Sequence, residues 1–200
     1  MDGAGSDRLA LQGVKAVFLD RDGVINENRP DHVKDWSEFR FLPGSTEAIA
    51  LLSRAGILVF VISNQAVVNR GIVSRETVDA INSRMIKEIG LMGGRVDAVA
   101  YCPHLPEERC NCRKPEPGLL LGIAHQYGLE LKNAVVIGDA MSDIVAAQSV
   151  GCQAILVMTG RGRDQLMMAK TAGKNSFAVA SDLRAAVDLL LTGTVKRSRA

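Results

Sequence analysis

Two aspartates that could carry chemistry stand two residues apart in the segment Asp20-Arg21-Asp22-Gly23. They follow a short apolar run, and Gly23 allows the tight backbone turn that would bring both carboxylates into one small volume. Converging carboxylates repel each other unless a cation offsets their charge, and Mg²⁺ is a hard ion that suits them. Taken alone, the segment is equally typical of a solvated turn with a chance pair of aspartates.

Polar groups also follow two later apolar runs. The segment Ser63-Asn64-Gln65 offers a hydroxyl and backbone N–H groups that suit a phosphate oxygen, although Ser and Asn are also ordinary turn residues. In Arg113-Lys114, the lysine offers a point charge for a phosphoryl group, and the arginine offers a fork for a second anion or for hydroxyls. A solvated basic turn is the alternative interpretation of that pair.

A further carboxylate, Asp139, ends another apolar run, and Asp143 follows it by four residues. Asp139 could be a turn residue, and Asp143 could serve only to cap the next helix or to complement its dipole. However, four successive loops offer a carboxylate pair, a hydroxyl, a lysine and a further carboxylate, in that order. This succession predicts one site better than it predicts four unrelated turns.

The elements that must position these groups alternate along the chain. Short Val/Ile-rich runs predict strands at 15–19, 57–62, 96–101, 134–137, 154–158 and 177–180. Amphipathic stretches predict helices at 45–55, 74–90, 142–150, 164–171 and 181–191, and a further helix opened by Pro117. The alternation predicts a three-layer, Rossmann-like α/β fold with a parallel sheet, whose ligands bind beyond the carboxyl ends of the strands.

Local residues mark the ends of two of these helices. Ser45 and Ser74 are predicted N-caps, and Gly56 and Gly90 are predicted stops. No linker or repeat divides the sequence, so we expect a single domain over 1–200 with flexible tails at 1–14 and 192–200.

Three cysteines and a histidine form the pattern C-x-H…C-x-C with Cys102, His104, Cys110 and Cys112. Three thiolates and an imidazole complete a tetrahedral set, which is typical of structural zinc. Reduced thiols without a metal are the alternative. Cys152 lies between a predicted helix and a predicted strand, where we expect it to be packed in the core.

The composition is that of an ordinary globular protein. Of the 200 residues, 47% are hydrophobic and 23% are charged, and the net charge is +2. No apolar run approaches the ~20 residues of a membrane helix, and no signal peptide is evident. We therefore expect a cytoplasmic protein, most simply a monomer, that binds a small molecule and neither membrane nor nucleic acid.

The motifs together resemble the haloacid-dehalogenase (HAD)-type phosphatases. The resemblance rests on D-R-D-G-V-I-N at 20–26, S-N-Q at 63–65, C-R-K-P at 112–115 and G-D-A-M-S-D at 138–143, and it extends to T-G-R-G at 159–162. Within that superfamily the sequence is most similar to the heptose 1,7-bisphosphate 7-phosphatases, with histidinol-phosphate phosphatases as near relatives. Both groups carry the C-x-H…C-x-C loop, so the loop does not separate the two substrates.

The resemblance implies a role for each group. Asp20 would attack phosphorus to form an aspartyl-phosphate, and Asp22 would act as acid and then as base. Mg²⁺ would lie on Asp20, Asp139 and the backbone carbonyl of Asp22. Ser63 and Lys114 would hold the phosphoryl oxygens.

Recognition of the remaining substrate would fall to other residues. The resemblance assigns this to Arg113, with Asn64, Gln65 and the loop 28–32 lining the pocket. Arg70 and Asp143 would be supporting residues.

Two departures from the family pattern concern the substrate pocket. Val67 stands where the heptose-bisphosphate enzymes have glycine, so the loop either differs in backbone or never needs a positive φ. One extra residue precedes His32, which we expect to be a loop residue, and His125 is expected on a helix surface or in packing.

The intervals between motifs leave no room for a large cap domain. A zinc-stabilised binding module without catalysis is the remaining alternative, but every catalytic position is filled and aromatic residues are only 4%.

Overall fold

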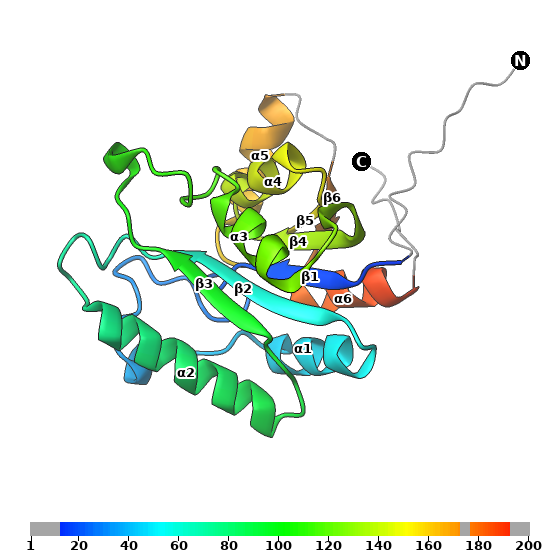
Figure 1. Ribbon diagram of the computed structural model, residues 1–200, viewed down its shortest axis with the longest axis horizontal. Coiled ribbons are helices and arrows are strands. Elements are labelled where there is room, and N and C mark those ends of the chain that lie inside the picture. The colour runs from blue at the N-terminus through cyan, green and yellow to red at the C-terminus, as the bar shows by residue number, and fades with distance from the viewer. Residues whose placement is uncertain (1–12, 173–176, 193–200) are drawn as a thin grey trace, which may run out of the picture.

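One parallel sheet of six strands runs through the protein (Figure 1). The computed structural model describes residues 13–172 and 177–192. The strand order is β3-β2-β1-β4-β5-β6, and every neighbouring pair is parallel. The strands are β1 Ala16–Leu19, β2 Leu58–Asn64, β3 Ala98–Cys102, β4 Ala134–Gly138, β5 Gln153–Val157 and β6 Ala178–Ala180. The predicted parallel α/β fold is therefore confirmed.

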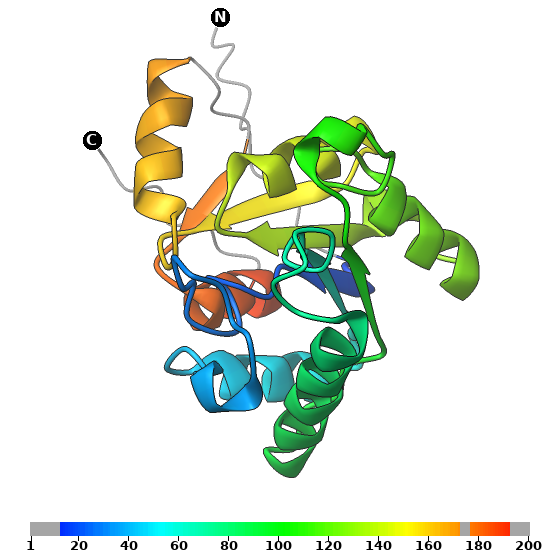
Figure 2. The ribbon, with the colours of Figure 1, turned by 90° about the vertical axis from the view of Figure 1, so that its left-hand side faces the viewer.

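Helices cover both faces of this sheet, and Figure 2 shows the sheet lying between the two layers. One layer packs on the sheet through one apolar cluster and consists of α1 Ser45–Arg54, α2 Arg75–Leu91 and α6 Leu183–Thr192. The opposite layer packs through a second cluster and consists of α3 Gly118–Tyr127, α4 Met141–Ser149 and α5 Gly162–Thr171. Successive strand residues point to opposite faces, so that Val17 belongs to the first cluster and Phe18 to the second.

The strand order reverses beside β1, because the chain leaves β1 for β2 on one side and later returns to place β4 on the other. In such sheets the crevice at the carboxyl ends of the central strands is where ligands bind. Residues 20–44, after β1, contain only the short 3₁₀ helix η1 Trp36–Glu38, and residues 103–117, after β3, contain only η2 Pro106–Glu108. A third 3₁₀ helix, η3 Leu131–Asn133, precedes β4. The crevice is therefore covered by loops, as the predicted minimal cap requires.

Helix ends differ from prediction at two positions. The predicted cap Ser45 is the first helical residue, and Gly44 occupies the N-cap because it adopts the left-handed conformation (φ 76°). The predicted stop Gly90 lies inside α2, where a side chain would meet only open space; the chain turns at Gly93 instead (φ 79°). Ser74 caps α2 as predicted, since its hydroxyl accepts the N–H of Thr77.

The predicted tails lie largely outside the described residues. At their inner ends, Val14 packs against the core, and Thr192 is the last residue of α6. In the part of the chain that the structure describes, no helix combines the length and the apolar character needed to cross a membrane.

Candidate active site

Three buried carboxylates meet at the carboxyl ends of the two central strands. Asp20 directly follows β1, Asp139 directly follows β4, and Asp143 lies in the first turn of α4. Each offers an oxygen within 4.8 Å of the other two. Burial raises the pKa of Asp139, and the charge of Asp20 raises it further. Asp143 also caps α4, because its Oδ2 accepts the N–H of Ala140.

A buried lysine reaches into this cluster from the loop between β3 and α3. The Nζ of Lys114 lies 2.9 Å from Oδ1 of Asp20, 2.6 Å from Oδ1 of Asp143 and 2.9 Å from the carbonyl oxygen of Ile62. Burial alone would lower the pKa of Lys114, but the charges of Asp143 and Asp20 outweigh it and raise the pKa. Burial also raises the pKa of Asp20. The positive charge of Lys114 offsets only part of this rise, so the pKa of Asp20 is about 6.

The two oxygens of Asp20 differ in their environment. Oδ1 accepts hydrogen bonds from the N–H of Arg21 (2.8 Å) and from Lys114 (2.9 Å). Within the described residues, no hydrogen bond reaches Oδ2. A carboxylate held by one oxygen keeps the other available to attack an electrophile.

The carboxylate of Asp22 is directed into a different hydrogen-bond network. It accepts bonds from the guanidinium of Arg21 (3.0 Å), from Nδ2 of Asn26 (2.9 Å) and from Nε2 of Gln65 (2.7 Å). Burial pushes its pKa up, but the charge of Arg21 and these hydrogen bonds outweigh burial and lower the pKa. The side chain is not one of the three clustered carboxylates. It could therefore contribute to a metal there through its backbone carbonyl only.

The end of β2 supplies the predicted polar tripeptide. The hydroxyl of Ser63 is buried and accepts a hydrogen bond from Nε2 of Gln65 (2.8 Å). The side chain of Asn64 pairs with the backbone of Lys114, accepting its N–H and donating to its carbonyl, both at 3.0 Å. Asn64 therefore fixes the loop that carries the lysine, although 50 residues separate the two.

These groups open into a cleft of about 380 Å³. Its outer wall is basic and comes from loops, and it includes Arg29, Arg70, Arg113 and Arg161. The predicted pocket loop contributes too, with His32 lying 3.2 Å from the guanidinium of Arg70. A cleft lined by the carboxylates of Asp20 and Asp22 and by several guanidinium groups suits a substrate that carries more than one phosphate.

Two arginines in the site were not predicted as site residues. Arg161, from the T-G-R-G segment, donates its backbone N–H to Asp139 (2.8 Å) and pairs with the same carboxylate through its guanidinium (3.1 Å). Arg161 follows β5, the strand next to β4 in the sheet. This position at the carboxyl edge of the sheet could have identified it as a site residue from the sequence. Arg21, next to both aspartates, is almost fully buried and contacts Asp22. Asn26 also had no predicted role.

The loop after β2 accommodates Val67 without strain. Among the described residues other than glycine, only His32 (φ 65°) and Arg109 (φ 46°) have positive φ. Val67 is 1% exposed and packs with Val73 and Val78 in a small apolar cluster. This loop therefore needs no glycine at that position.

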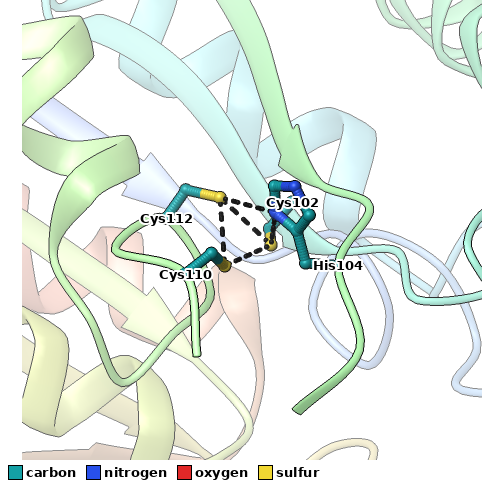
Figure 3. A group of neighbouring side chains, drawn as sticks. All are labelled: Cys102, His104, Cys110 and Cys112. Atoms are coloured by element: carbon teal, nitrogen blue, oxygen red, sulfur yellow. Dashed lines mark hydrogen bonds between the residues drawn. The ribbon is translucent and has the colours of Figure 1, made fainter. Parts of the chain in front are cut away.

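The four predicted zinc ligands converge at one point (Figure 3). Cys112 Sγ lies 3.2 Å from Cys102 Sγ, 3.4 Å from Cys110 Sγ and 3.2 Å from His104 Nδ1. The cysteines are free thiols. Cys152 lies apart: it is buried, its thiol donates to the carbonyl of Leu131, and burial raises its pKa to about 12.

The donors at the carboxylate cluster fit a magnesium ion. Burial raises the pKa of both Asp20 and Asp139, so a cation beside them would favour their charged forms. Oxygen donors are the ligands that Mg²⁺ takes. Only glycine fits at positions 23 and 160, where the backbone approaches Asp139 closely, because a Cβ at either position would stand 2.2 Å from its Oδ2.

An aspartate free to attack, a metal-type carboxylate cluster, a buried lysine and a serine on successive strand ends define a phosphatase of the HAD type. A family model described as HAD-hydrolase-like matches residues 111–186. The chain belongs to the family of D-glycero-β-D-manno-heptose-1,7-bisphosphate 7-phosphatases within the HAD-like hydrolases.

Relatives along nearly the whole chain support this membership. The chain is 39% identical to that phosphatase of Pseudomonas aeruginosa, over 88% of this chain and 97% of the relative. It is 40% identical to that of Bordetella bronchiseptica, over 89% and 98%. The crystal structure of the B. bronchiseptica D,D-heptose 1,7-bisphosphate phosphatase, complexed with magnesium and phosphate, is similar with a TM-score of 0.85 at 39% identity, covering 90% of this chain and 99% of that one.

Proposed function

We propose that this phosphatase removes the 7-phosphate of D-glycero-D-manno-heptose 1,7-bisphosphate with the help of Mg²⁺. The observation that carries the proposal is the carboxylate and lysine cluster, of which Asp20 and Lys114 line a cleft that several arginines also line. Relatives named for this reaction, which match nearly the whole chain, support the choice of substrate. The rim offers guanidinium groups for the phosphate that remains on the sugar.

In the proposed first step, Oδ2 of Asp20 attacks phosphorus, and the bond between phosphorus and the sugar oxygen breaks. Against the effect of burial, Arg21 lowers the pKa of Asp22 in the unliganded site, so this step requires the negative charge of the arriving phosphoryl group to raise that pKa. Asp22 is then protonated and gives its proton to the departing oxygen. In the second step, Asp22 takes a proton from water, which attacks the aspartyl-phosphate and releases inorganic phosphate. Ser63 and Lys114 hold the phosphoryl oxygens, and the positive charge of Lys114 stabilises the charge that develops on them.

The proposed metal ligands are the carboxylates of Asp20 and Asp139 and the backbone carbonyl of Asp22, with Asp143 in support. A bound Mg²⁺ supplies positive charge that lets an anionic nucleophile and an anionic phosphate approach each other. Asp143 holds Lys114 at 2.6 Å, which keeps the ammonium between the two carboxylates that flank it.

A structural zinc held by Cys102, His104, Cys110 and Cys112 is part of the proposal. Arg113 directly follows Cys112, and its guanidinium donates to the carbonyl of His104 (3.2 Å). The zinc would thereby fix an arginine of the cleft rim. Free thiols that hold a metal need a reducing compartment, which supports the expected cytoplasmic location. All the proposed groups come from one chain, so the proposal requires no second subunit.

The deciding experiment is a comparison of substrates. We would measure kcat/KM for phosphate release in Mg²⁺ with the α and β anomers of heptose 1,7-bisphosphate and with histidinol phosphate. We expect a strong preference for one heptose anomer. Turnover of histidinol phosphate without turnover of either bisphosphate would overturn the substrate assignment, and full activity of Asp20→Asn would overturn the mechanism. Metal analysis of the purified protein is expected to find one zinc per chain.

A further inference from the structure

A buried polar residue on α2 has no part in the chemistry above. Asn82 is 6% exposed and lies among apolar residues of the same helix, between Ile81 and Met85 on the face that packs against the sheet. Asparagine is a poor residue for a helix interior, and a buried amide destabilises the fold unless it is hydrogen bonded. Its Oδ1 accepts a hydrogen bond from Nη1 of Arg21 at 3.1 Å.

The guanidinium of Arg21 links Asn82 to the active site. Arg21 is 1% exposed, and its Nε and Nη2 donate to Oδ2 of Asp22 at 3.2 and 3.0 Å. Asn82 and Asp22 thus bind different nitrogens of one rigid, planar group. Since the guanidinium is planar, fixing Nη1 at the helix also fixes the direction from which the other nitrogens meet the carboxylate.

We propose that Asn82, through Arg21, orients the carboxylate of Asp22 for proton transfer to the departing oxygen. Asn82 is a positioning residue, because it does not line the cleft and reaches Asp22 only through Arg21. We call Asn82, Arg21 and Asp22 the positioning triad. The inference rests on the proposed role of Asp22 as the acid, since only an acid must point at the leaving oxygen.

The geometry of the loop explains why a second element is needed. Asp22 lies in a turn just beyond β1, and its side chain is 23% exposed to the cleft, whereas that of Asp20 is 7% exposed. Asn26 and Gln65 also donate to Asp22, but both come from loops that border the same cleft. Among the described residues, only Arg21 ties the carboxylate to a helix on the covered face of the sheet. Without Asn82, one N–H of a buried guanidinium loses its partner, and the group can turn.

The test compares leaving groups that do and do not need an acid. Asn82→Leu removes the acceptor and suits the apolar surroundings, whereas Asn82→Asp keeps an acceptor. Met85→Leu is the matched control, a nearly isosteric change on the same buried face. Single-turnover release of the leaving group would be measured for heptose 1,7-bisphosphate, whose alkoxide must be protonated, and for p-nitrophenyl phosphate, whose nitrophenolate leaves unaided.

We expect Asn82→Leu to slow single-turnover release of the sugar by about 10-fold or more and release of nitrophenolate by less than about two-fold, with KM from steady-state assays unchanged. Asn82→Asp should retain most of the rate on the sugar, and Met85→Leu should match the wild type. Equal losses on both substrates, or no loss on either, would refute the positioning role. If Asn82→Leu does not fold, as judged by its melting curve, Asn82→Ala takes its place with the same expectations.

A parallel variant separates this inference from the proposed function. Asp22→Asn should lose sugar release selectively and far more strongly than Asn82→Leu. A selective loss in Asp22→Asn with wild-type rates in Asn82→Leu would overturn the inference alone. Absence of any selective loss in Asp22→Asn would overturn the role of Asp22 as the acid, and the inference with it.

Discussion

Replacing the proposed nucleophile by its neutral isostere should stabilise the metal-free protein while abolishing its activity. Burial raises the pKa of Asp20 from 3.8 to about 6, even with Lys114 beside it. The folded state therefore holds the proton of Asp20 more tightly than the unfolded chain does. It follows that the ionised carboxylate lowers the free energy of unfolding at pH values above about 6, and that this penalty fades as the pH falls toward 3.8.

The size of the effect follows from the same pKa. The difference between the pKa of Asp20 in the folded protein and in the unfolded chain corresponds to a loss of roughly 3 kcal/mol in the free energy of unfolding at pH 7.5. Near pH 4 this loss is almost nothing. Asparagine can keep the acceptor that Arg21 and Lys114 use at Oδ1, and its amide nitrogen would replace Oδ2, to which no described residue donates. We therefore expect Asp20→Asn to raise the free energy of unfolding by up to about 3 kcal/mol at pH 7.5.

The assay is urea unfolding of wild type and Asp20→Asn at pH 7.5 and pH 4.5, in buffer freed of Mg²⁺ by dialysis without a chelator that could also remove zinc. Added Mg²⁺ should reduce the difference in free energy of unfolding between Asp20→Asn and wild type, because it binds the wild-type carboxylates. Asp31→Asn is the control: Lys34 and Arg29 lower the pKa of Asp31 to about 2, so this change should not stabilise the protein. An Asp20→Asn protein that is no more stable than wild type at pH 7.5 would refute the reasoning.

Three further predictions concern Gly23, Val67 and Cys152. Gly23→Ala should abolish phosphatase activity and weaken Mg²⁺ binding measured by calorimetry, because the new Cβ would stand 2.2 Å from Oδ2 of Asp139 at a φ of +89°; wild-type binding would contradict this. Val67→Ala should lower the free energy of unfolding by about 2 kcal/mol in urea, since Val67 is buried against Val78, whereas an unchanged midpoint would show that the cluster contributes nothing. Cys152 should resist iodoacetamide at pH 8 until the protein is unfolded, because burial raises its pKa to about 12; mass spectrometry of the native protein would reveal early alkylation if this is wrong.

Short-range features of the sequence were sufficient for the fold. Each predicted strand is a short run that is apolar on both faces, and such runs have few alternatives to the middle of a parallel sheet. The helix ends were less well predicted. Whether Ser45 or Gly44 caps α1 depends on one backbone conformation, and Gly90 can remain in α2 because nothing packs against it there.

The identity of the candidate site residues was also accessible to sequence reasoning, because parallel strands all bring their carboxyl ends to one edge of the sheet. That rule places Asp20, Ser63 and Asp139 together without any knowledge of distances. The spacing of Cys102, His104, Cys110 and Cys112 likewise predicted a cluster, since so short a loop can bring its own ligands together.

Sequence patterns were thus enough to predict the kind of sheet, the edge at which the chemistry lies and the residue types that meet there. Which of these groups touch depends on tertiary packing. It directs the side chain of Asp22 into the network of Arg21 and Gln65, and it brings Asn82 from α2 to Arg21, 61 residues away in the chain. Periodicity and strand order specify faces and edges of elements, whereas hydrogen bonds depend on side-chain directions and on distances of a few tenths of an ångström. Those are settled only when distant segments pack against each other.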